Sequence, residues 1–198
     1  MTLKLGLTGS IATGKSTVLA AFAELGVPVF SSDEYVHELY RGAAVAPVEA
    51  AFPGVTANGV IDRERLGRVV LGQPERIRQL EAIVHPLVRD GIRAFLAEAE
   101  ARGEPIAVVD IPLLFENGVD WGLDGVIVTT VDEAELRRRA LARPGMTVEK
   151  LDAILARQLP QAEKIRRATH VFDTSGTIAA TRSAVRALVT RLRARDQQ

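Results

Sequence analysis

The residues best suited to chemistry lie near the N-terminus, in the segment Gly9-Ser10-Ile11-Ala12-Thr13-Gly14-Lys15-Ser16. This segment matches the pattern G-x-x-x-x-G-K-[ST] at every fixed position. In such a loop, backbone N–H groups surround a chain of phosphates. Lys15 adds positive charge beside the terminal phosphates, and the Ser16 hydroxyl can bind Mg²⁺. A glycine turn that merely contains a lysine is the alternative. The complete match favours nucleotide phosphate binding but does not indicate which reaction follows.

The segments that flank this loop fit the strand and the helix that it requires. Leu3 to Thr8 places apolar residues at alternate positions, as a short strand does. Lys15 to Leu25 has apolar residues at helical spacing, and Gly26 follows as a stop signal. The start of the helix adds its own partial positive charge, which favours a bound anion.

Two aspartates follow other short apolar segments that resemble strands. Asp33 comes after Val27–Phe30, and Asp110 ends the segment Ile106–Asp110. Ligands of parallel α/β folds bind at the carboxyl ends of the strands. We therefore expect the phosphate loop, Asp33 and Asp110 to meet at one edge of a sheet.

Each aspartate has a chemical and a structural interpretation. Asp110 could hold Mg²⁺, directly or through water, or could cap a turn after its strand. Asp33 could orient a hydroxyl acceptor and take its proton during phosphoryl transfer. Asp33 or Ser32 could instead cap the following helix. Spacing alone leaves the two interpretations of Asp33 open.

Four arginines lie between residues 137 and 143. Arg137 and Arg138 fit a solvated helix face, whereas Arg139 and Arg143 lie one turn apart on one side of the expected helix. That pair could close over the phosphates and neutralise the charge of the transferred group. The turn Pro144-Gly145 and a further helix after Thr147 suggest a helical hairpin that acts as a mobile lid.

The composition is that of an ordinary globular protein. The 198 residues are 47% hydrophobic and 25% charged, with a formal net charge of +0. Neutral charge argues against a nucleic-acid protein driven by overall charge. Cysteine is absent, which excludes disulfides and thiolate metal sites. Neither a signal-peptide pattern nor an apolar run of membrane-spanning length occurs. We expect a cytoplasmic protein that does not bind membranes.

Strands and helices alternate along most of the chain, which predicts a three-layer α/β/α fold with a central parallel sheet. Residues 34–102 are mainly helical, with Asp62 opening one helix and Pro74 in the first turn of the next. Pro86 should kink or divide that second helix. Further strands are expected at 125–129 and 171–172, and a last helix at 177–193.

Several segments together resemble the dephospho-CoA kinase family, from Leu5 to about Leu188. The resemblance rests on the phosphate loop through Thr17, Ser32-Asp33, Asp62-Arg63, the pattern H-P-x-x-R at 85–89, the pattern D-x-P-L-L-x-E at 110–116, and Arg139, Arg143, Gln158 and Lys164. Phosphate loops are shared by many families. The combination of the two longer patterns in this order is far narrower.

The resemblance implies a P-loop NTPase fold with a helical substrate-binding insertion and a helical lid. It implies ATP-dependent phosphorylation of the ribose 3′-hydroxyl of dephospho-CoA, with Mg²⁺, in a monomer or small homo-oligomer. The implied catalytic residues are Asp33, Lys15 and Arg139. The nucleotide would contact Gly9 to Thr17 and Arg143, and Ser16 and Asp110 would bind the metal. The acceptor would contact Asp33, His85, Arg89, Asp110, Leu113 and Glu116.

The resemblance also implies boundaries within one domain, 1–198. The core would cover about 1–33, 103–136 and 166–198, the helical substrate region about 34–102, and the lid about 137–165. Ser10 and Ala12 stand where the family usually has glycine, His37 where arginine is common, and Thr174 where asparagine is common.

Two other functions fit the phosphate loop. One is another small-molecule kinase, for nucleoside monophosphates or shikimate, which Lys15-Ser16-Thr17 and the 110–116 pattern disfavour. The other is a nucleotide-driven switch that acts through a protein partner. The chain has no N-K-x-D motif for reading guanine, which disfavours the switch.

Overall fold

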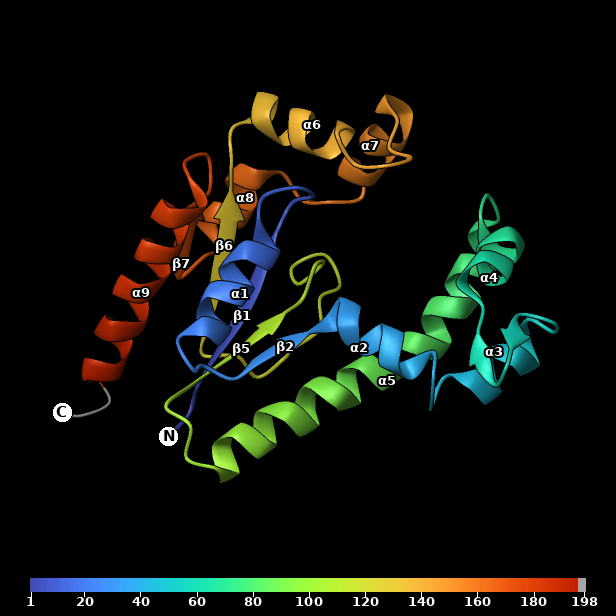
Figure 1. Ribbon diagram of the computed structural model, residues 1–198, viewed down its shortest axis with the longest axis horizontal. Coiled ribbons are helices and arrows are strands. Elements are labelled where there is room, and N and C mark those ends of the chain that lie inside the picture. The colour runs from blue at the N-terminus through green and yellow to red at the C-terminus, as the bar shows by residue number, and fades with distance from the viewer. Residues whose placement is uncertain (196–198) are drawn as a thin grey trace. The chain divides into compact units, whose positions relative to one another are not determined.

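The computed structural model describes residues 1–195 (Figure 1). The last three residues of the expected core, 196–198, lie outside the described part. The chain divides into two compact units, one formed by Met1–Phe30 with Leu96 onward and the other by Ser31–Phe95. Among residues 1–195, no helix combines the length and apolarity needed to cross a membrane.

The first unit is built around a five-stranded sheet with the strand order β2-β5-β1-β6-β7. Strand β1 lies at its centre and runs parallel to β5 and β6, and β7 runs parallel to β6. Residues 106–109 are fully buried aliphatic residues, as expected for a parallel sheet covered on both faces. The strands are β1 (Leu3–Gly9), β2 (Val29–Ser31), β5 (Ile106–Asp110), β6 (Gly125–Thr130) and β7 (His170–Asp173).

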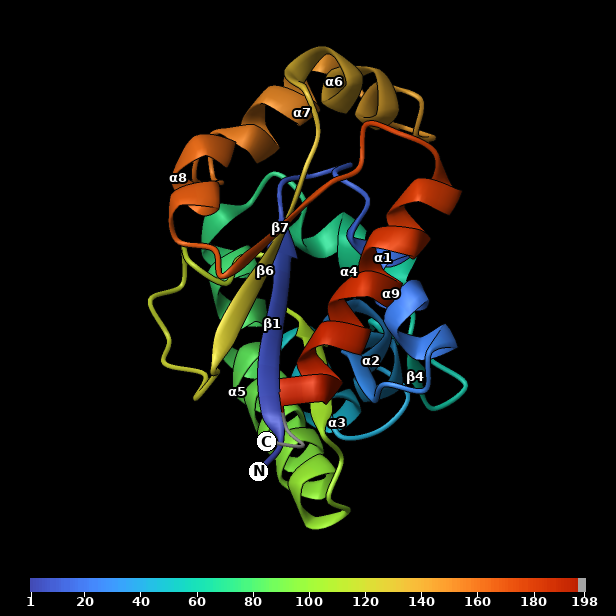
Figure 2. The ribbon, with the colours of Figure 1, turned by 90° about the vertical axis from the view of Figure 1, so that its left-hand side faces the viewer.

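Helices cover both faces of this sheet. Helices α1 and α9 lie on one side of β6 and β7 and α8 on the other (Figure 2). On the first side, Leu5 and Leu7 of β1 pack with Val18 and Phe22 of α1 in the main core. The helices of this unit are α1 (Lys15–Glu24), α6 (Glu133–Leu141), α7 (Val148–Leu155), α8 (Gln161–Arg166) and α9 (Ile178–Arg195).

The second unit is mainly helical. It contains one short hairpin, whose Asn58-Gly59 turn has both residues at positive φ, 52° and 77°. Its long helix α5 continues into the first unit at Leu96. The elements are α2 (Ser32–Leu39), α3 (Val45–Ala51), β3 (Thr56–Ala57), β4 (Val60–Ile61), α4 (Arg63–Val70) and α5 (Pro74–Ala101).

Most sequence predictions of elements are confirmed. The strands fall where the apolar segments lie. Asp62 opens α4 as predicted, and Asp132 and Thr147 cap α6 and α7. The expected helix after Thr147 is α7, which runs from Val148 to Leu155. Helices α3 and α8 and the pairing of β3 with β4 were not predicted.

Two further expectations differ from the structure in detail. The expected division of the helix at Pro86 does not occur, because α5 runs without a break from Pro74 to Ala101. Both Pro86 and Ala82, whose carbonyl loses its partner to the proline, are exposed, so water can bond to that carbonyl. Neither Ser32 nor Asp33 caps α2: the Ser31 hydroxyl accepts the Glu34 N–H at 3.3 Å.

Candidate active site

The phosphate loop, residues 9–16, is held by hydrogen bonds beneath it. The buried Thr13 hydroxyl donates to the Ser10 carbonyl at 2.8 Å and lies 2.7 Å from the hydroxyl of Thr129 at the end of β6. A Cβ at Gly9 would collide with both threonine hydroxyls. Glycine is therefore required there by close packing against β6.

Two residues of the loop have left-handed backbone conformations. Gly14 has φ 80° and Ala12 has φ 61°. Glycine adopts this conformation freely, whereas alanine is disfavoured by about 1 kcal/mol or more. Of the two positions where the family usually has glycine, Ala12 therefore carries this cost and Ser10, which has no positive φ, does not.

Burial of the Ala12 side chain opposes this cost. The methyl group joins an apolar cluster with Val131, directly after β6, and with Leu136, Ala140 and Leu151 of helices α6 and α7. The tip of the phosphate loop is thus part of the apolar core of helices α6 and α7.

Helix α1 begins directly after this loop without a side-chain cap. Its N-cap residue is Gly14, which has no side chain to accept a hydrogen bond. Helices α2, α4, α6 and α7 each begin with a side-chain cap. The N-terminal N–H groups and the partial positive charge of α1 are therefore suited to an anion.

Lys15 and Asp110 lie in the same unit as the loop. The Lys15 ammonium group donates to the Gly9 carbonyl at 3.1 Å, so it folds back over the loop that it follows. Asp110 is only 6% exposed and ends β5 beside Leu7 of β1. Ser16, in the first turn of α1, is exposed.

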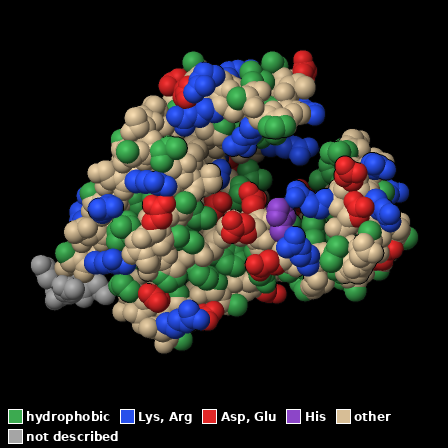
Figure 3. Space-filling model, viewed as in Figure 1, with side chains coloured by type: hydrophobic (Ala, Val, Ile, Leu, Met, Phe, Trp, Pro, Cys, Tyr) green, Lys and Arg blue, Asp and Glu red, His purple; other side chains and the backbone are tan. Residues whose placement is uncertain are grey.

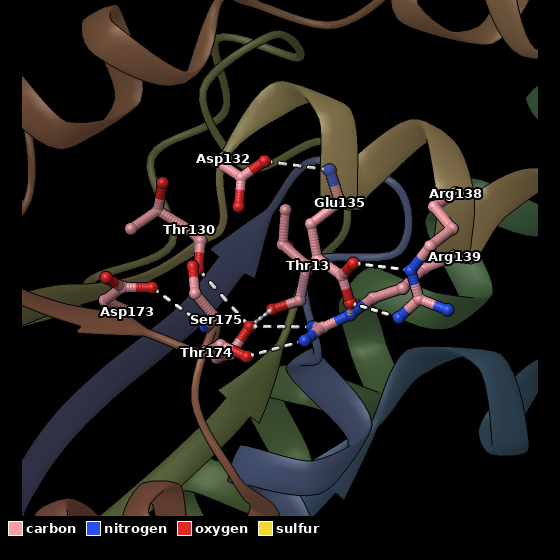
Figure 4. Close-up of polar contacts among 9 residues, drawn as sticks. All are labelled: Thr13, Thr130, Asp132, Glu135, Arg138, Arg139, Asp173, Thr174 and Ser175. Carbon is pink, nitrogen blue, oxygen red and sulfur yellow. Dashed lines mark hydrogen bonds and ion pairs between the residues drawn. The ribbon is translucent and has the colours of Figure 1, made fainter.

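Thr174, in the turn after β7, connects the loop to Arg139 (Figure 4). Its buried hydroxyl donates to the Thr13 carbonyl at 2.9 Å, with the Thr130 carbonyl at 3.3 Å. The Arg139 guanidinium donates to the Thr174 hydroxyl at 3.2 Å and to the Thr174 carbonyl at 2.8 Å. Sequence reasoning noted Thr174 only as a departure from the family pattern.

Glu135 holds the same arginine from the other side. It accepts the Arg139 Nε–H at 2.6 Å and pairs with Arg138. Hydrogen bonds from Arg138 and then Arg139 lower the pKa of Glu135 to about 2. Glu135 is therefore an anion at any physiological pH, and Arg139 is fixed by three of its five N–H groups (Figure 4).

Arg143 contrasts with Arg139, although the two lie one turn apart. Its side chain is exposed and makes no hydrogen bond or ion pair within the described residues. Of the two predicted lid arginines, Arg139 is thus bound to the protein and Arg143 is available to a ligand.

Two glutamines join the far end of the lid to the rest of the unit. The Gln158 side-chain oxygen accepts the Ile11 N–H of the phosphate loop at 3.1 Å. Gln161 accepts the Val131 N–H at 3.2 Å and donates to the Val131 carbonyl at 3.0 Å. Gln161 therefore ties the chain leaving the lid to the chain entering it.

Glu116 and Lys164 form a buried ion pair below this connection. Lys164 Nζ lies 2.8 Å from Glu116 Oε1, and the two side chains are 0% and 12% exposed. The Leu159 N–H donates to the same carboxylate at 2.8 Å. Burial raises the pKa of Glu116. The hydrogen bond and positive charge of Lys164, together with the hydrogen bond from the Leu159 N–H, lower it by more, so the pKa lies below its usual value. Half-buried Leu113 lies in the turn that leads to Glu116.

Asp33 belongs to the second unit, where Ser31 performs the capping role. The Asp33 side chain is exposed, and its carboxylate makes no hydrogen bond or ion pair within residues 31–95. Helix α2 lies close against α5, because a Cβ at Gly91 would collide with the Tyr35 ring. The expected meeting of Asp33 with the phosphate loop stays a prediction, because the two belong to different units.

His85 and Arg89 lie one turn apart on α5, also in the second unit. His85 is exposed and Arg89 is half-buried, and neither side chain makes a hydrogen bond or ion pair within residues 31–95. Both are therefore available to a ligand. Elsewhere, acidic and basic side chains are interspersed over α3, α4 and the lid helices (Figure 3), which fits the neutral net charge.

Comparison with known proteins identifies the family of this chain. The family model for dephospho-CoA kinase matches residues 3–180. A dephospho-CoA kinase from Brucella melitensis is 53% identical over 188 residues, covering 95% of this chain and 94% of its own. One from Mesorhizobium japonicum is 54% identical over 189 residues, covering 96% of each chain.

Solved structures agree on the fold. A protein from Thermus thermophilus has a TM-score of 0.76 and 35% identity, covering 96% of this chain and 98% of its own. Dephospho-CoA kinase from Campylobacter jejuni has a TM-score of 0.70 and 24% identity, covering 96% of each chain. Shikimate kinase from Aquifex aeolicus, with a TM-score of 0.56 and 13% identity over 98% of each chain, shares the fold alone.

Proposed function

Because this chain belongs to the dephospho-CoA kinase family, we propose which of its residues carry out that family's reaction. The enzyme transfers the terminal phosphoryl group of ATP to the ribose 3′-hydroxyl of dephospho-CoA, which completes coenzyme A. The observation that carries this function is the family match over residues 3–180, which includes an uncapped helix N-terminus behind a complete phosphate loop.

The triphosphate of ATP binds residues Gly9–Thr17. The N–H groups at the start of α1 bond to the phosphates, and Lys15 leaves the Gly9 carbonyl to pair with the terminal phosphates. The fixed Arg139 and the exposed Arg143 support this site from the lid. Positive charge on these groups stabilises the transferring phosphoryl group.

Ser16 and Asp110 are the residues that would hold Mg²⁺. Both offer oxygen ligands, which Mg²⁺ prefers, and both belong to the unit that contains the phosphate loop. Among residues 1–195, no group of three or more acidic, histidine or cysteine side chains could hold a metal ion. This fits a cation bound by one or two protein ligands, water and substrate phosphates. When bound, Mg²⁺ neutralises phosphate charge and aligns the transferred group.

Asp33 acts as the general base. Its exposed carboxylate accepts the proton of the ribose 3′-hydroxyl while that oxygen forms a bond to the γ-phosphorus. The bond between the γ-phosphorus and the bridging oxygen breaks, and ADP leaves. No covalent enzyme intermediate is required.

The division of labour along the chain follows from these roles. The helical region near 34–102, with His85 and Arg89, binds the acceptor, and the hairpin near 137–165 closes over the nucleotide to exclude water. Asp110, Leu113 and Glu116 line the acceptor side of the first unit. A monomer or small homo-oligomer located in the cytoplasm stays a prediction.

The replacement Asp33→Asn tests the base. It should lower kcat by about 10²–10⁴-fold, because the amide cannot accept the proton. Coenzyme A formation from ATP, Mg²⁺ and dephospho-CoA measures it, with adenylate and shikimate as alternative acceptors. Glu34→Gln, which neutralises the adjacent exposed carboxylate of α2, is the matched control and should change kcat little. Near-normal turnover by Asp33→Asn would remove Asp33 from this role.

A further inference from the structure

An open cavity of about 520 Å³ lies within the second unit. Four polar residues line it, and one of them is Asp33: the others are His37, Tyr40 and Arg63. The volume is within the range of small-molecule sites. A ligand in this cavity would therefore lie beside the carboxylate proposed as the base.

The rest of the cavity wall is aliphatic. Val36 of α2, Leu66 and Val70 of α4 and Leu80 of α5 contribute to it. Leu66 and Val70 lie one turn apart, so they form a continuous apolar strip along α4. The cavity combines a polar side with an apolar side, and this combination suits a ligand that has both characters.

Arg63 is the only positively charged side chain that lines the cavity. Its Nη1 lies 2.8 Å from His37 Nε2. Arginine can only donate, so His37 must accept through a neutral Nε2. The histidine therefore orients the guanidinium without neutralising its charge.

The other two arginines of α4 have acidic partners. Arg65 pairs with Asp62 at 3.2 Å, and Arg68 pairs with Glu64 at 3.4 Å. Within residues 31–95, Arg63 has no acidic partner within 4.0 Å. Its positive charge and its remaining N–H groups are available to an anion.

The pKa of Tyr40 reflects the positive charge of Arg63. Burial raises the pKa of the Tyr40 phenol, and the positive charge of Arg63 opposes that rise. The positive charge of Arg63 thus reaches Tyr40, and the phenol stays protonated and able to donate a hydrogen bond.

We propose that Arg63, oriented by His37, binds the diphosphate bridge of the acceptor in this cavity. The proposal rests on the proposed function. Dephospho-CoA carries its reacting hydroxyl on a ribose, and a diphosphate joins that nucleoside to a long, partly aliphatic arm. A planar guanidinium pairs with two phosphate oxygens at once. The aliphatic wall of α4 and α5 then receives the arm, and Asp33 faces the ribose.

Two acceptors of different length test this assignment. Dephospho-CoA contains the diphosphate and the arm, whereas adenosine offers the same ribose hydroxyl without either. Arg63→Ala should raise KM for dephospho-CoA by about 10–100-fold, the scale of hydrogen bonds to a charged group, and should change kcat far less. Its kcat/KM for adenosine should stay within about threefold of the wild-type value, because adenosine has no anion for Arg63 to bind.

Control variants separate binding from folding. Arg68→Ala removes an exposed, ion-paired arginine of the same helix and should leave both acceptors unaffected. Arg63→Lys keeps the charge but loses the paired donors, so its KM should be intermediate. His37→Gln preserves a neutral acceptor and should resemble the wild type, whereas His37→Leu should raise KM for dephospho-CoA. Melting temperatures close to that of the wild type show that each variant folds.

The outcomes distinguish failure of the Arg63 proposal from failure of the proposed kinase function. If Arg63→Ala has the wild-type KM for dephospho-CoA, or loses both acceptors equally, Arg63 does not bind the diphosphate. If the wild-type protein itself does not phosphorylate dephospho-CoA, the proposed function fails.

Discussion

The phosphate loop and the second unit differ in how two of their proposed functional side chains are held. Around the loop, Thr174 and Arg139 are fixed by hydrogen bonds to the protein. In the second unit, Asp33 and His85 are exposed, and neither makes a hydrogen bond or ion pair within residues 31–95. A triphosphate can be bound by a preorganised set of backbone donors, because its charge and spacing do not vary. Exposed side chains such as Asp33 and His85 become ordered only when the acceptor binds, and this ordering costs part of the binding free energy.

The largest effect is expected at the buried ion pair of the first unit, between Lys164 and Glu116. Lys164→Met leaves the Glu116 carboxylate buried without its partner, and the free energy of unfolding should fall by about 3–5 kcal/mol. Urea denaturation measures it. Lys150→Met is the control, because Lys150 is an exposed lid lysine bonded only to the Gly145 carbonyl. Equal losses for the two variants would contradict the structural role of the pair.

The pH dependence of the free energy of unfolding tests the same Glu116–Lys164 pair. The pKa of Glu116 is lowered on folding, so its stabilisation is present above the unfolded value of about 4.3 and is lost as pH falls through the lower folded value. The stability difference between the wild type and Glu116→Gln should therefore narrow below about pH 4. A constant difference would show that Glu116 does not carry this charge.

A smaller effect is expected for Thr174→Val, which keeps the shape but removes the hydroxyl. The Thr13 carbonyl and the Arg139 guanidinium each lose a hydrogen-bond partner in a buried site. We expect KM for ATP to rise about 10-fold, while KM for dephospho-CoA stays unchanged. Thr174→Ser retains the hydroxyl and should restore ATP affinity. If Thr174→Val raises only KM for dephospho-CoA and not KM for ATP, Thr174 does not support the nucleotide site.

The smallest effect is expected at Ser31, two residues before the proposed base. Ser31→Ala removes the cap of α2 and should lower the free energy of unfolding by about 1 kcal/mol. Thermal unfolding measures the loss. Its kcat should match the wild type, in contrast with Asp33→Asn. A large loss of kcat in Ser31→Ala would mean that the position of α2, and not the carboxylate alone, limits the reaction.

The sequence predicted the strands and the phosphate loop well, because buried parallel strands are continuous apolar segments and the loop has a fixed spacing. It was less able to choose the cap of α2, because Ser31, Ser32 and Asp33 all favour that position. Helix α5 continues through Pro86 at a place where both Pro86 and Ala82 are exposed, and a sequence does not reveal that exposure.

The contacts that fix the nucleotide side were not predictable from spacing. Thr174 bonds to Thr13 across 161 residues, and Gln158 bonds to Ile11 across 147. The resemblance to a family named Gln158 and Lys164 but gave no partner for either. Such pairs depend on how the strands are ordered in the sheet, and a single sequence does not encode that order as a local pattern.

The left-handed Ala12 couples the phosphate loop structurally to the lid hairpin. Its methyl group lies in the apolar cluster of α6 and α7, and the neighbouring Ile11 N–H is bonded to Gln158. Detaching the hairpin would therefore expose both, so the loop and the hairpin should behave as one cooperative unit in hydrogen exchange. Sequence drift on either side is then constrained by the other: a bulkier residue at 12 would be accommodated only by a matching loss of volume at Leu136, Ala140 or Leu151.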